Sequence, residues 1–343
     1  MRAVVGHQQA QSLLGLAVAS EQVTHAYLFA GPDGIGKTTL ALAFAALLQC
    51  EQPDLIAGEP CGACSSCRRI AHGTHPDVTL VEAEEGKRQL GIDAVRENVI
   101  HLANLAPSSG RWRVFILPNV ERMTPNTVNA LLKTLEEPPD RVVLLLTSAE
   151  PENLLPTLLS RCQLVPMRPL AMDVIADALT TRWSVPVERA HTLAGLASGR
   201  LGWAVRAHDD PDLASARAEH LNKLLACTYA GRDERLAAAA RFGADAEAAR
   251  SAIELWMFWW RDVVLAAHGA VHLLSDGAAR DEAAAQGQAI GPQRAERFLR
   301  ALIEAQSALD QNANPRLTLD VLMLDLPRLT HQTSVPAARA PRS

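Results

Sequence analysis

The sequence predicts an α/β domain built on a parallel sheet, followed by two helical domains. Three observations predict this fold class. Short apolar runs alternate with helical patterns over residues 1–168, a glycine-rich loop joins the first apolar run to a helix, and strand signals stop beyond Pro169. Alternating strands and helices build parallel sheets, whereas helices without strands pack on one another.

The first elements surround the glycine-rich loop. His25–Ala30 is a short apolar run that predicts a strand, and Thr38–Leu48 is rich in Ala and Leu, which favour a helix. Asp77–Glu82 predicts a second strand. A further helix is predicted by apolar residues at helical spacing, which are Ile92, Val95, Val99 and Leu102.

Three more strands complete the predicted sheet. Trp112–Leu117 is the third strand, and a helix over 125–137 follows it, with Thr124 as its N-cap and a proline at its first position. Arg141–Thr147 is an almost continuous apolar run, as expected of a parallel strand buried on both faces. Gln163–Pro166 is a candidate fifth strand.

The second half of the chain predicts helices alone. Residues 169–210 form a small domain of short helices, and residues 211–330 form a domain of longer ones, including Ile253–Ala267 and Gln293–Leu309. Residues 331–343 contain two prolines and no apolar period, so we predict a disordered tail.

Charge and hydropathy restrict the function. The net charge of −5 and the lack of a basic cluster argue against a protein that binds nucleic acid strongly by itself. No apolar run reaches the roughly 18 residues that span a bilayer, and the N-terminus does not resemble a signal peptide. We therefore expect a cytoplasmic protein.

Residues 31–38, Gly-Pro-Asp-Gly-Ile-Gly-Lys-Thr, match the phosphate-binding P-loop pattern. The glycines let backbone N–H groups surround phosphate oxygens, and the start of the next helix favours anions. Lys37 is expected to reach the β- and γ-phosphates, and the Thr38 hydroxyl to bind Mg²⁺. The predicted nucleotide-binding residues are Gly31, Gly34, Gly36, Lys37, Thr38 and Thr39.

Hydrolysis also needs an acidic residue after another strand to hold Mg²⁺. The third strand is instead followed by Pro118 and Asn119. Proline cannot bind a metal, and an amide is a poor base. Glu121 lies further along, in the turn before the next helix. The sequence thus predicts a chain that can hold ATP but does not hydrolyse it.

Four of the six cysteines, Cys50, Cys61, Cys64 and Cys67, lie close together in the sequence. Clustered cysteines in a cytosolic protein indicate a metal more often than disulfides. Four thiolates with short spacings suit a closed, structural Zn²⁺ site. An iron–sulfur cluster and unliganded thiols are the alternatives.

These residues resemble the clamp-loader branch of the AAA+ proteins over nearly the whole chain. The resemblance rests on residues 25–38, on the four cysteines, and on the run Asn129-Ala-Leu-Leu-Lys-Thr-Leu-Glu-Glu-Pro-Pro139. It also rests on Leu155-Pro-Thr-Leu-Leu-Ser-Arg-Cys162 and on Asn312-Ala-Asn-Pro-Arg-Leu317. It implies an AAA+ P-loop domain with a zinc module at 50–67, a helical lid and a helical collar that forms oligomers.

Within that family the chain resembles the non-hydrolysing stator rather than a motor. Motors of the gamma/tau type carry an Asp-Glu pair where this chain has Pro118-Asn119, and a lid arginine where it has Gly202. The intact P-loop departs from some stators, so ATP binding stays open. A gamma/tau-type motor that hydrolyses ATP is the alternative.

The resemblance gives Ser160 and Arg161 a catalytic role in trans, with Arg161 as an arginine finger on a neighbour's ATP. Without it, a surface ion pair would be the simpler interpretation. The resemblance also places Thr147 near the γ-phosphate. The aromatic residues of 256–260 predict either core packing or, as we favour, a subunit contact.

The resemblance also implies the partners. They are the gamma/tau and delta subunits of the clamp loader, and, through the assembled complex, the sliding clamp and primer-template DNA. The chain would belong to a DNA-directed DNA polymerase holoenzyme, without polymerase or independent ATPase chemistry of its own. A zinc-dependent nucleic-acid-binding module is a further alternative, which the net acidity disfavours.

Overall fold

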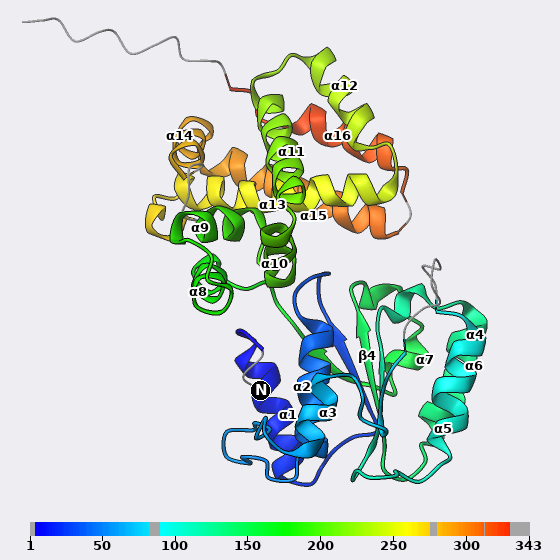
Figure 1. Cartoon of the computed structure of the whole chain (residues 1–343). Coiled ribbons are helices and arrows are strands. Elements are labelled where there is room, and N and C mark those ends of the chain that lie inside the picture. The colour runs from blue at the N-terminus through cyan, green and yellow to red at the C-terminus, as the bar shows by residue number, and fades with distance from the viewer. Residues whose placement is uncertain (1–3, 82–89, 275–279, 312, 330–343) are drawn as a thin grey trace, which may run out of the picture. The chain divides into compact units, whose positions relative to one another are not determined.

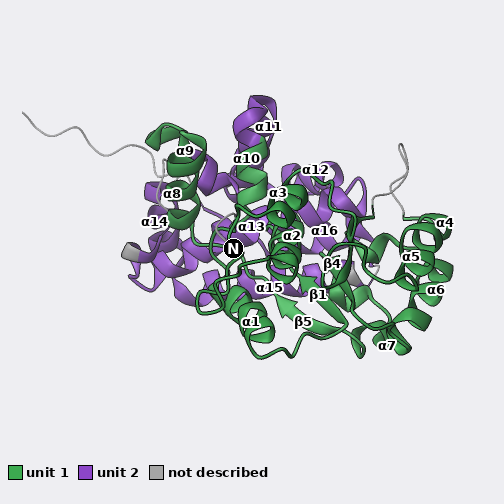
Figure 2. Cartoon of the chain, turned by 60° about the horizontal axis from the view of Figure 1, so that its bottom comes forward, with its two compact units in different colours: residues 1–190, 199–206 green, residues 191–198, 207–343 purple. Residues whose placement is uncertain are grey.

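The computed structural model describes residues 4–81, 90–274, 280–311 and 313–329. The chain divides into two compact units (Figure 2). Unit 1 comprises residues 1–190 and 199–206, and unit 2 comprises residues 191–198 and 207–343. The finer division into domains at 168/169 and 210/211 stays a prediction.

Unit 1 is built on a five-stranded, all-parallel sheet with the strand order β2-β3-β4-β1-β5. The strands are β1 (Ala26–Ala30), β2 (Val78–Leu80), β3 (Arg113–Leu117), β4 (Val142–Ser148) and β5 (Gln163–Pro166). The predicted α/β fold class with a parallel sheet is confirmed.

Helices cover both faces of the sheet (Figure 1). The α-helices of the first 209 residues are α1 (Gln8–Ala19), α2 (Lys37–Gln49), α3 (Ser65–Ala71), α4 (Ile92–Val95), α5 (His101–Ala103), α6 (Pro125–Glu136), α7 (Pro156–Leu159), α8 (Met172–Trp183), α9 (Val187–Leu196) and α10 (Leu201–Asp209), of which α8 to α10 follow the last strand in the chain. A π-helical segment, Arg96–Ile100, joins α4 to α5. Helix α9 crosses from unit 1 into unit 2.

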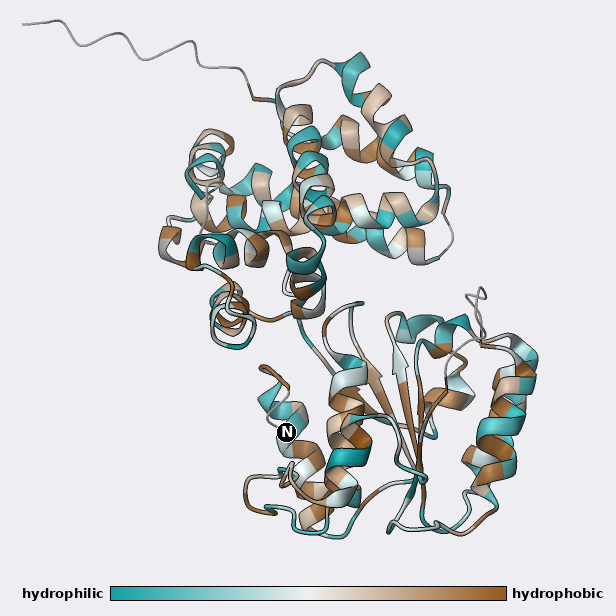
Figure 3. Ribbon diagram, viewed as in Figure 1, coloured by the Kyte–Doolittle hydropathy of each residue, from teal (hydrophilic) through white to brown (hydrophobic). Residues whose placement is uncertain are grey.

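The core of unit 1 follows the alternation of side chains along each strand. On β1, Tyr27 and Phe29 pack with α1 and α2, and Tyr27 meets the ring of Phe44 edge-on with centroids 5.0 Å apart. Ala26 and Leu28 point the other way and pack with α4 and α6. The strands form a hydrophobic layer between helices with polar outer turns (Figure 3). Burial on both faces explains why these strands read as continuous apolar runs.

The predicted start of α6 is confirmed in detail. The hydroxyl of Thr124 accepts a hydrogen bond from the backbone N–H of Thr127, and Pro125 occupies the first helical position. The predicted strands lie where the structure has them, except that β2 is shorter than Asp77–Glu82. Residue 82 lies outside the described residues.

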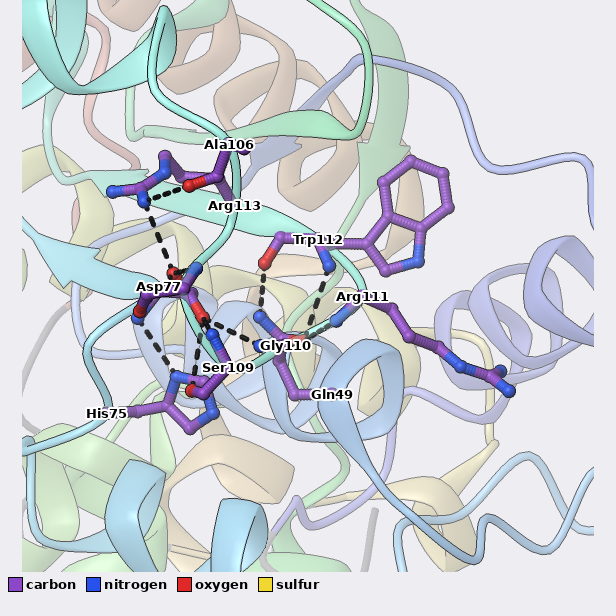
Figure 4. Close-up of polar contacts among 10 residues, drawn as sticks. Gln49, His75, Asp77, Ala106, Ser109, Gly110, Arg111, Trp112 and Arg113 are labelled. Atoms are coloured by element: carbon purple, nitrogen blue, oxygen red, sulfur yellow. Dashed lines mark hydrogen bonds and ion pairs between the residues drawn. The ribbon is translucent and has the colours of Figure 1, made fainter.

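A buried polar cluster holds the edge of the sheet where the strands begin (Figure 4). The carboxylate of Asp77 accepts hydrogen bonds from the backbone N–H groups of Ser108, Ser109 and Gly110, at 2.7–2.8 Å. It also lies 3.3 Å from Nη2 of Arg113. Nearby, the amide oxygen of Gln49 accepts from the backbone N–H of Arg111 at 3.0 Å. The turn before β3 is thereby attached to β2 and to the end of α2.

Unit 2 is helical throughout its described part. Besides the ends of α9 and α10, it contains α11 (Pro211–Tyr229), α12 (Arg232–Phe242), α13 (Ala246–Ala267), α14 (Arg280–Ile290), α15 (Pro292–Asp310) and α16 (Pro315–Asp325). None of the helices in the described part of the chain is long and apolar enough to cross a membrane. The predicted tail, residues 331–343, lies outside the described residues.

The aromatic residues of α13 form the core of unit 2. Trp256, Trp259 and Trp260 are all buried, and Phe298 of α15 packs against Trp256 and Trp260. The indole N–H of Trp259 donates to the side-chain oxygen of Gln286 at 3.1 Å. The favoured interpretation of these tryptophans as a subunit contact is therefore wrong. Residues three and four apart share one helix face, and here that face is the core.

Candidate nucleotide site and metal centre

The P-loop lies at the carboxyl edge of the sheet, directly after β1. The backbone N–H of Gly31 donates to the carbonyl of Ser148 at 3.1 Å, which ties the loop to the end of β4. Gly34 and Gly36 have φ values of 77° and 110°, which side-chain-bearing residues rarely adopt. Helix α2 then begins at Lys37 with Gly36 as its N-cap. Thr38 is half-buried and Thr39 is exposed.

The ammonium group of Lys37 is turned back onto its own loop. It donates to the carbonyls of Gly31 at 2.7 Å and Pro32 at 3.2 Å, and to Oδ1 of Asp33 at 3.1 Å. Lys37 is only 6% exposed. Because an ammonium has three N–H groups, these three acceptors satisfy it.

Asp33 has a second cationic neighbour. Its Oδ2 lies 3.6 Å from Nη2 of Arg122, which belongs to the short 3-10 turn Val120–Arg122 after β3. Both side chains are about half exposed, so this pair is weakly stabilising. The carboxylate nevertheless connects the P-loop to the turn that follows the third strand.

The residues after β3 form no acidic metal site. The strand ends at Leu117, as predicted, so Pro118 and Asn119 stand at its carboxyl end. Asn119 has a φ of 51°, and its backbone N–H donates to Oγ1 of the buried Thr147 at 3.1 Å. Oε1 of Glu121 accepts from the backbone N–H of Ala149 at 3.2 Å. Thr147 and Glu121 thus brace the ends of β3 and β4.

The P-loop also contacts the start of α10 at very short range. The backbone N–H of Gly202 donates to the carbonyl of Gly34 at 2.7 Å. A Cβ atom on Gly202 would lie 2.8 Å from that carbonyl oxygen, closer than real side chains approach. Position 202 therefore accommodates only a residue without a side chain in this arrangement.

The four clustered cysteines are brought together. The Sγ atoms of Cys50, Cys61, Cys64 and Cys67 all lie within 4.8 Å of one another. Four sulfurs bound to one zinc ion at about 2.3 Å lie roughly 3.8 Å apart, so a small contraction completes a tetrahedral site. Cys50 follows α2, and Cys64 caps the start of α3.

Backbone N–H groups point at these sulfurs, as they do where thiolates bind a metal. The N–H of Cys61 donates to Sγ of Cys50 at 3.2 Å, and the N–H of Cys67 donates to Sγ of Cys64 at 3.4 Å. The N–H groups of Ala63 and Cys64 donate to Cys61 and lower the pKa of its thiol to about 6. Burial raises the pKa of Cys50. The donor set and its hydrogen bonds fit a metal with a preference for thiolate.

Arg161 lies between α7 and β5, next to Ser160. Its Nη1 donates to the carbonyl of Thr157 at 2.8 Å, and its Nη2 contacts Oε1 of Glu136 at 2.8 Å, with 32% of the side chain exposed. The next strand begins at Gln163, which is paired with Tyr27 near the start of β1. Arg161 is therefore at the amino edge of the sheet, away from the chain's own P-loop.

Three residues at these sites were not singled out by the sequence analysis. Asp33 lies inside the P-loop pattern at a position where any residue is accepted, and Arg122 becomes relevant only through its contact with Asp33. The buried carboxylate of Asp77 was included in a predicted strand as an ordinary member. An acidic residue at the head of an otherwise apolar strand was the available signal.

Comparisons with known proteins find similarity to subunits of DNA polymerase III. A profile of the family described as "DNA polymerase III, delta subunit" matches residues 6–171. DNA polymerase III subunit delta' of Pseudomonas aeruginosa is 42% identical over 191 residues, which are 54% of this chain and 56% of that protein. The Bacillus subtilis subunit delta' is 32% identical, over 60% of each chain.

Relatives named subunit tau and solved structures match as well. DNA polymerase III subunit tau of Escherichia coli is 35% identical over 51% of this chain and 26% of its own length. A gamma-subunit-related protein of Thermotoga maritima has a TM-score of 0.40 at 17% identity, covering 93% of this chain and 98% of its own.

The matched part spans between a quarter and three fifths of the length of these curated relatives. The family profile matches the part of the chain that carries the P-loop and the four cysteines. Residues 6–171 are therefore similar to the DNA polymerase III delta-subunit family, and the relatives named delta' agree with that match.

Proposed function

We propose that this chain is a delta-prime-type subunit of the DNA polymerase III clamp loader, an AAA+ protein that acts as a stator and does not hydrolyse ATP. The observation that carries the proposal is the end of β3. Pro118 and Asn119 follow it directly, and the carboxylate of Glu121 is engaged by the N–H of Ala149. A P-loop without an acidic residue to hold Mg²⁺ can bind a nucleotide but lacks the groups that drive its hydrolysis.

The catalytic contribution of the chain is then Arg161, acting in trans with Ser160 beside it. The residues of β1 separate the two edges of the sheet by roughly 13 Å. An arginine at the amino edge cannot serve the P-loop at the carboxyl edge of the same chain, but it can serve a nucleotide held by a neighbour. Glu136 and the carbonyl of Thr157 hold its guanidinium at the surface.

The cofactors follow from the two sites. Gly31, Gly34, Gly36 and Lys37 would hold the phosphates of a nucleotide, with Thr38 and Thr39 at the start of α2 beside them. The four cysteines would hold one structural Zn²⁺, which fastens the loop between α2 and α3. Because free thiolates persist in reducing compartments, we place the protein in the cytoplasm.

The proposed partners are the gamma/tau and delta subunits, with the helices of unit 2 forming the collar. The sliding clamp and primer-template DNA are reached through the assembled complex. The chain would contribute to a DNA-directed DNA polymerase holoenzyme without polymerase chemistry of its own.

The test measures ATP turnover by the chain alone and by the clamp loader assembled with wild-type or Arg161→Ala protein. We expect no turnover by the chain alone. Arg161→Ala should reduce turnover at the neighbouring site by about 10³-fold, the lower range measured for arginine fingers, while assembly measured by gel filtration is retained. Lys133→Ala, an exposed charge on α6, is the matched control and should leave turnover unchanged.

A gamma/tau-type motor is the second candidate, favoured by the intact P-loop and by the tau relatives. It requires turnover by the isolated chain that Lys37→Ala abolishes. That result, or full turnover in the complex that contains Arg161→Ala, would rule out the stator.

A further inference from the structure

We propose that the P-loop prefers a nucleoside diphosphate to a triphosphate and binds it without Mg²⁺, because Asp33 places a carboxylate where the terminal phosphate has to bind. The inference rests on the nucleotide-holding role proposed above and names the nucleotide. It is carried by the contacts of Lys37, Asp33 and Arg122.

The first step concerns the donors of Lys37. Its three N–H groups are used by the carbonyls of Gly31 and Pro32 and by the carboxylate of Asp33. The carbonyls belong to the loop backbone and stay in place when a nucleotide binds. The side chain of Asp33 is 53% exposed and free to turn outward. An arriving phosphate therefore displaces the carboxylate and takes over its N–H group.

The second step concerns charge. A P-loop lysine reaches both the β- and the γ-phosphate of a triphosphate. The carboxylate of Asp33 lies 3.1 Å from the ammonium that must make both contacts. Even after turning outward it stays within a few bond lengths of that place, so a γ-phosphate meets a like charge at short range. A diphosphate ends at the β-phosphate and carries less charge toward Asp33.

The third step concerns the metal. In a hydrolysing site the acidic group stands after the third strand, and Mg²⁺ supplies the positive charge. Here the acidic group is in the P-loop, and the turn after the third strand supplies a cation, Arg122. Pro118 and Asn119 offer no carboxylate to a metal ion. The positive charges beside the P-loop thus include Lys37, Arg122 and Arg206, whose guanidinium lies next to Gly34, so that binding does not depend on Mg²⁺.

The experiment is a calorimetric titration of the nucleotide-free full chain with ADP and with ATP, each in Mg²⁺ and in a chelator. We expect ADP to bind at least about tenfold more tightly than ATP, the scale of one like-charge contact near a protein surface. The affinity for ADP should be the same with and without Mg²⁺.

Asp33→Asn keeps the shape of the side chain and removes its charge. We expect it to strengthen ATP binding and to bring the ADP-to-ATP affinity ratio close to one. Asp140→Asn removes an exposed carboxylate from the turn before β4, at the opposite edge of the sheet, and should leave the ratio unchanged.

The proposal fails if the wild-type chain binds ATP as tightly as ADP, if the ratio persists in Asp33→Asn, or if the wild-type chain binds neither nucleotide. It also fails if ADP binding requires Mg²⁺. None of these results bears on the proposed arginine finger, because the role of Arg161 is measured as ATP turnover at a neighbour's site. Loss of the Arg161 effect with an intact ADP preference would overturn the stator instead.

Discussion

Asp77 is a buried carboxylate that its hydrogen-bond donors keep ionised. Burial alone would raise its pKa, but three backbone N–H groups and the hydroxyls of Ser108 and Ser109 stabilise the carboxylate and lower the pKa to about 2. Arg113 adds a cation at 3.3 Å. The carboxylate therefore organises the turn over residues 108–110, which leads into β3.

Asp77→Asn should destabilise unit 1 by about 3 kcal/mol, since an amide presents N–H groups to a turn that itself donates and leaves Arg113 without a counter-ion. Chemical denaturation followed by circular dichroism measures the change. The lowered pKa means that the carboxylate stabilises the fold above its unfolded pKa of about 4, and that this contribution is lost as pH falls toward 2. The difference between variant and wild type should therefore shrink over that range, whereas Asp140→Asn should change little at any pH.

The sequence predicted side chains whose role depends on a local pattern. The P-loop residues and the four cysteines each lie within a short stretch, so spacing alone indicated their chemistry. The pairs Asp33–Arg122 and Asp77–Arg113 join residues from different strands and turns. Their partners are determined by strand order in the sheet, which no local pattern contains.

At the scale of elements, the loop between α2 and α3 depends on its cysteines. It contains Leu55 and Ile56, both well exposed, and contributes few side chains to the core. Within this loop, the backbones of Asp54 and Glu59 pair in an isolated antiparallel β-bridge. A bound metal would therefore supply much of the energy that holds this loop.

Cys64→Ser should reduce the bound zinc from one ion per chain to nearly none, measured by atomic absorption on protein purified without chelator. The loop should then become sensitive to limited proteolysis, while the sheet keeps its circular dichroism signal. Cys162→Ser, outside the cluster, is the control and should keep its zinc. Full zinc content in Cys64→Ser would contradict the four-cysteine site.

Element positions were predicted well where a strand is buried on both faces, because its apolar run ends where the core ends. β3, whose five residues are all buried, matches its predicted bounds closely, and so does β5, although only Val165 of that strand is buried. β2 was predicted too long because Asp77 and Val81 adjoin its apolar residues in the sequence. The backbone carbonyl of Asp77 does accept from Val114 at 2.8 Å, but its side chain is committed to the turn over 108–110.

At the scale of the whole molecule, unit 2 presents an apolar stripe that its own core does not use. Leu317, Val321 and Leu324 are 63%, 60% and 50% exposed and lie along one face of α16, while Leu319, Leu322 and Met323 face the core. The side chain of Asn314 caps this helix, and Pro315 is its first residue. Of the run Asn312–Leu317, which contributes to the family resemblance, Asn312 lies outside the described residues.

If unit 2 forms a collar, Val321→Glu should weaken assembly with the gamma/tau and delta subunits by about tenfold or more, because a charge would be buried at an apolar contact. Sedimentation of the mixed subunits measures this. The fold should be unaffected, since the side chain is exposed. Gln311→Glu adds the same charge just beyond the end of α15 and should assemble normally. If Val321→Glu assembles normally, α16 is not part of the subunit interface.

The contact between Gly34 and Gly202 has a consequence for substitution. The N–H of Gly202 is bonded to the carbonyl of Gly34, so the P-loop fills the space where a side chain at position 202 would lie. Any such side chain would collide with backbone before it could meet a nucleotide. If the chain is the stator proposed above, an arginine introduced at position 202 alone would therefore not make it a motor, because the P-loop would have to move as well.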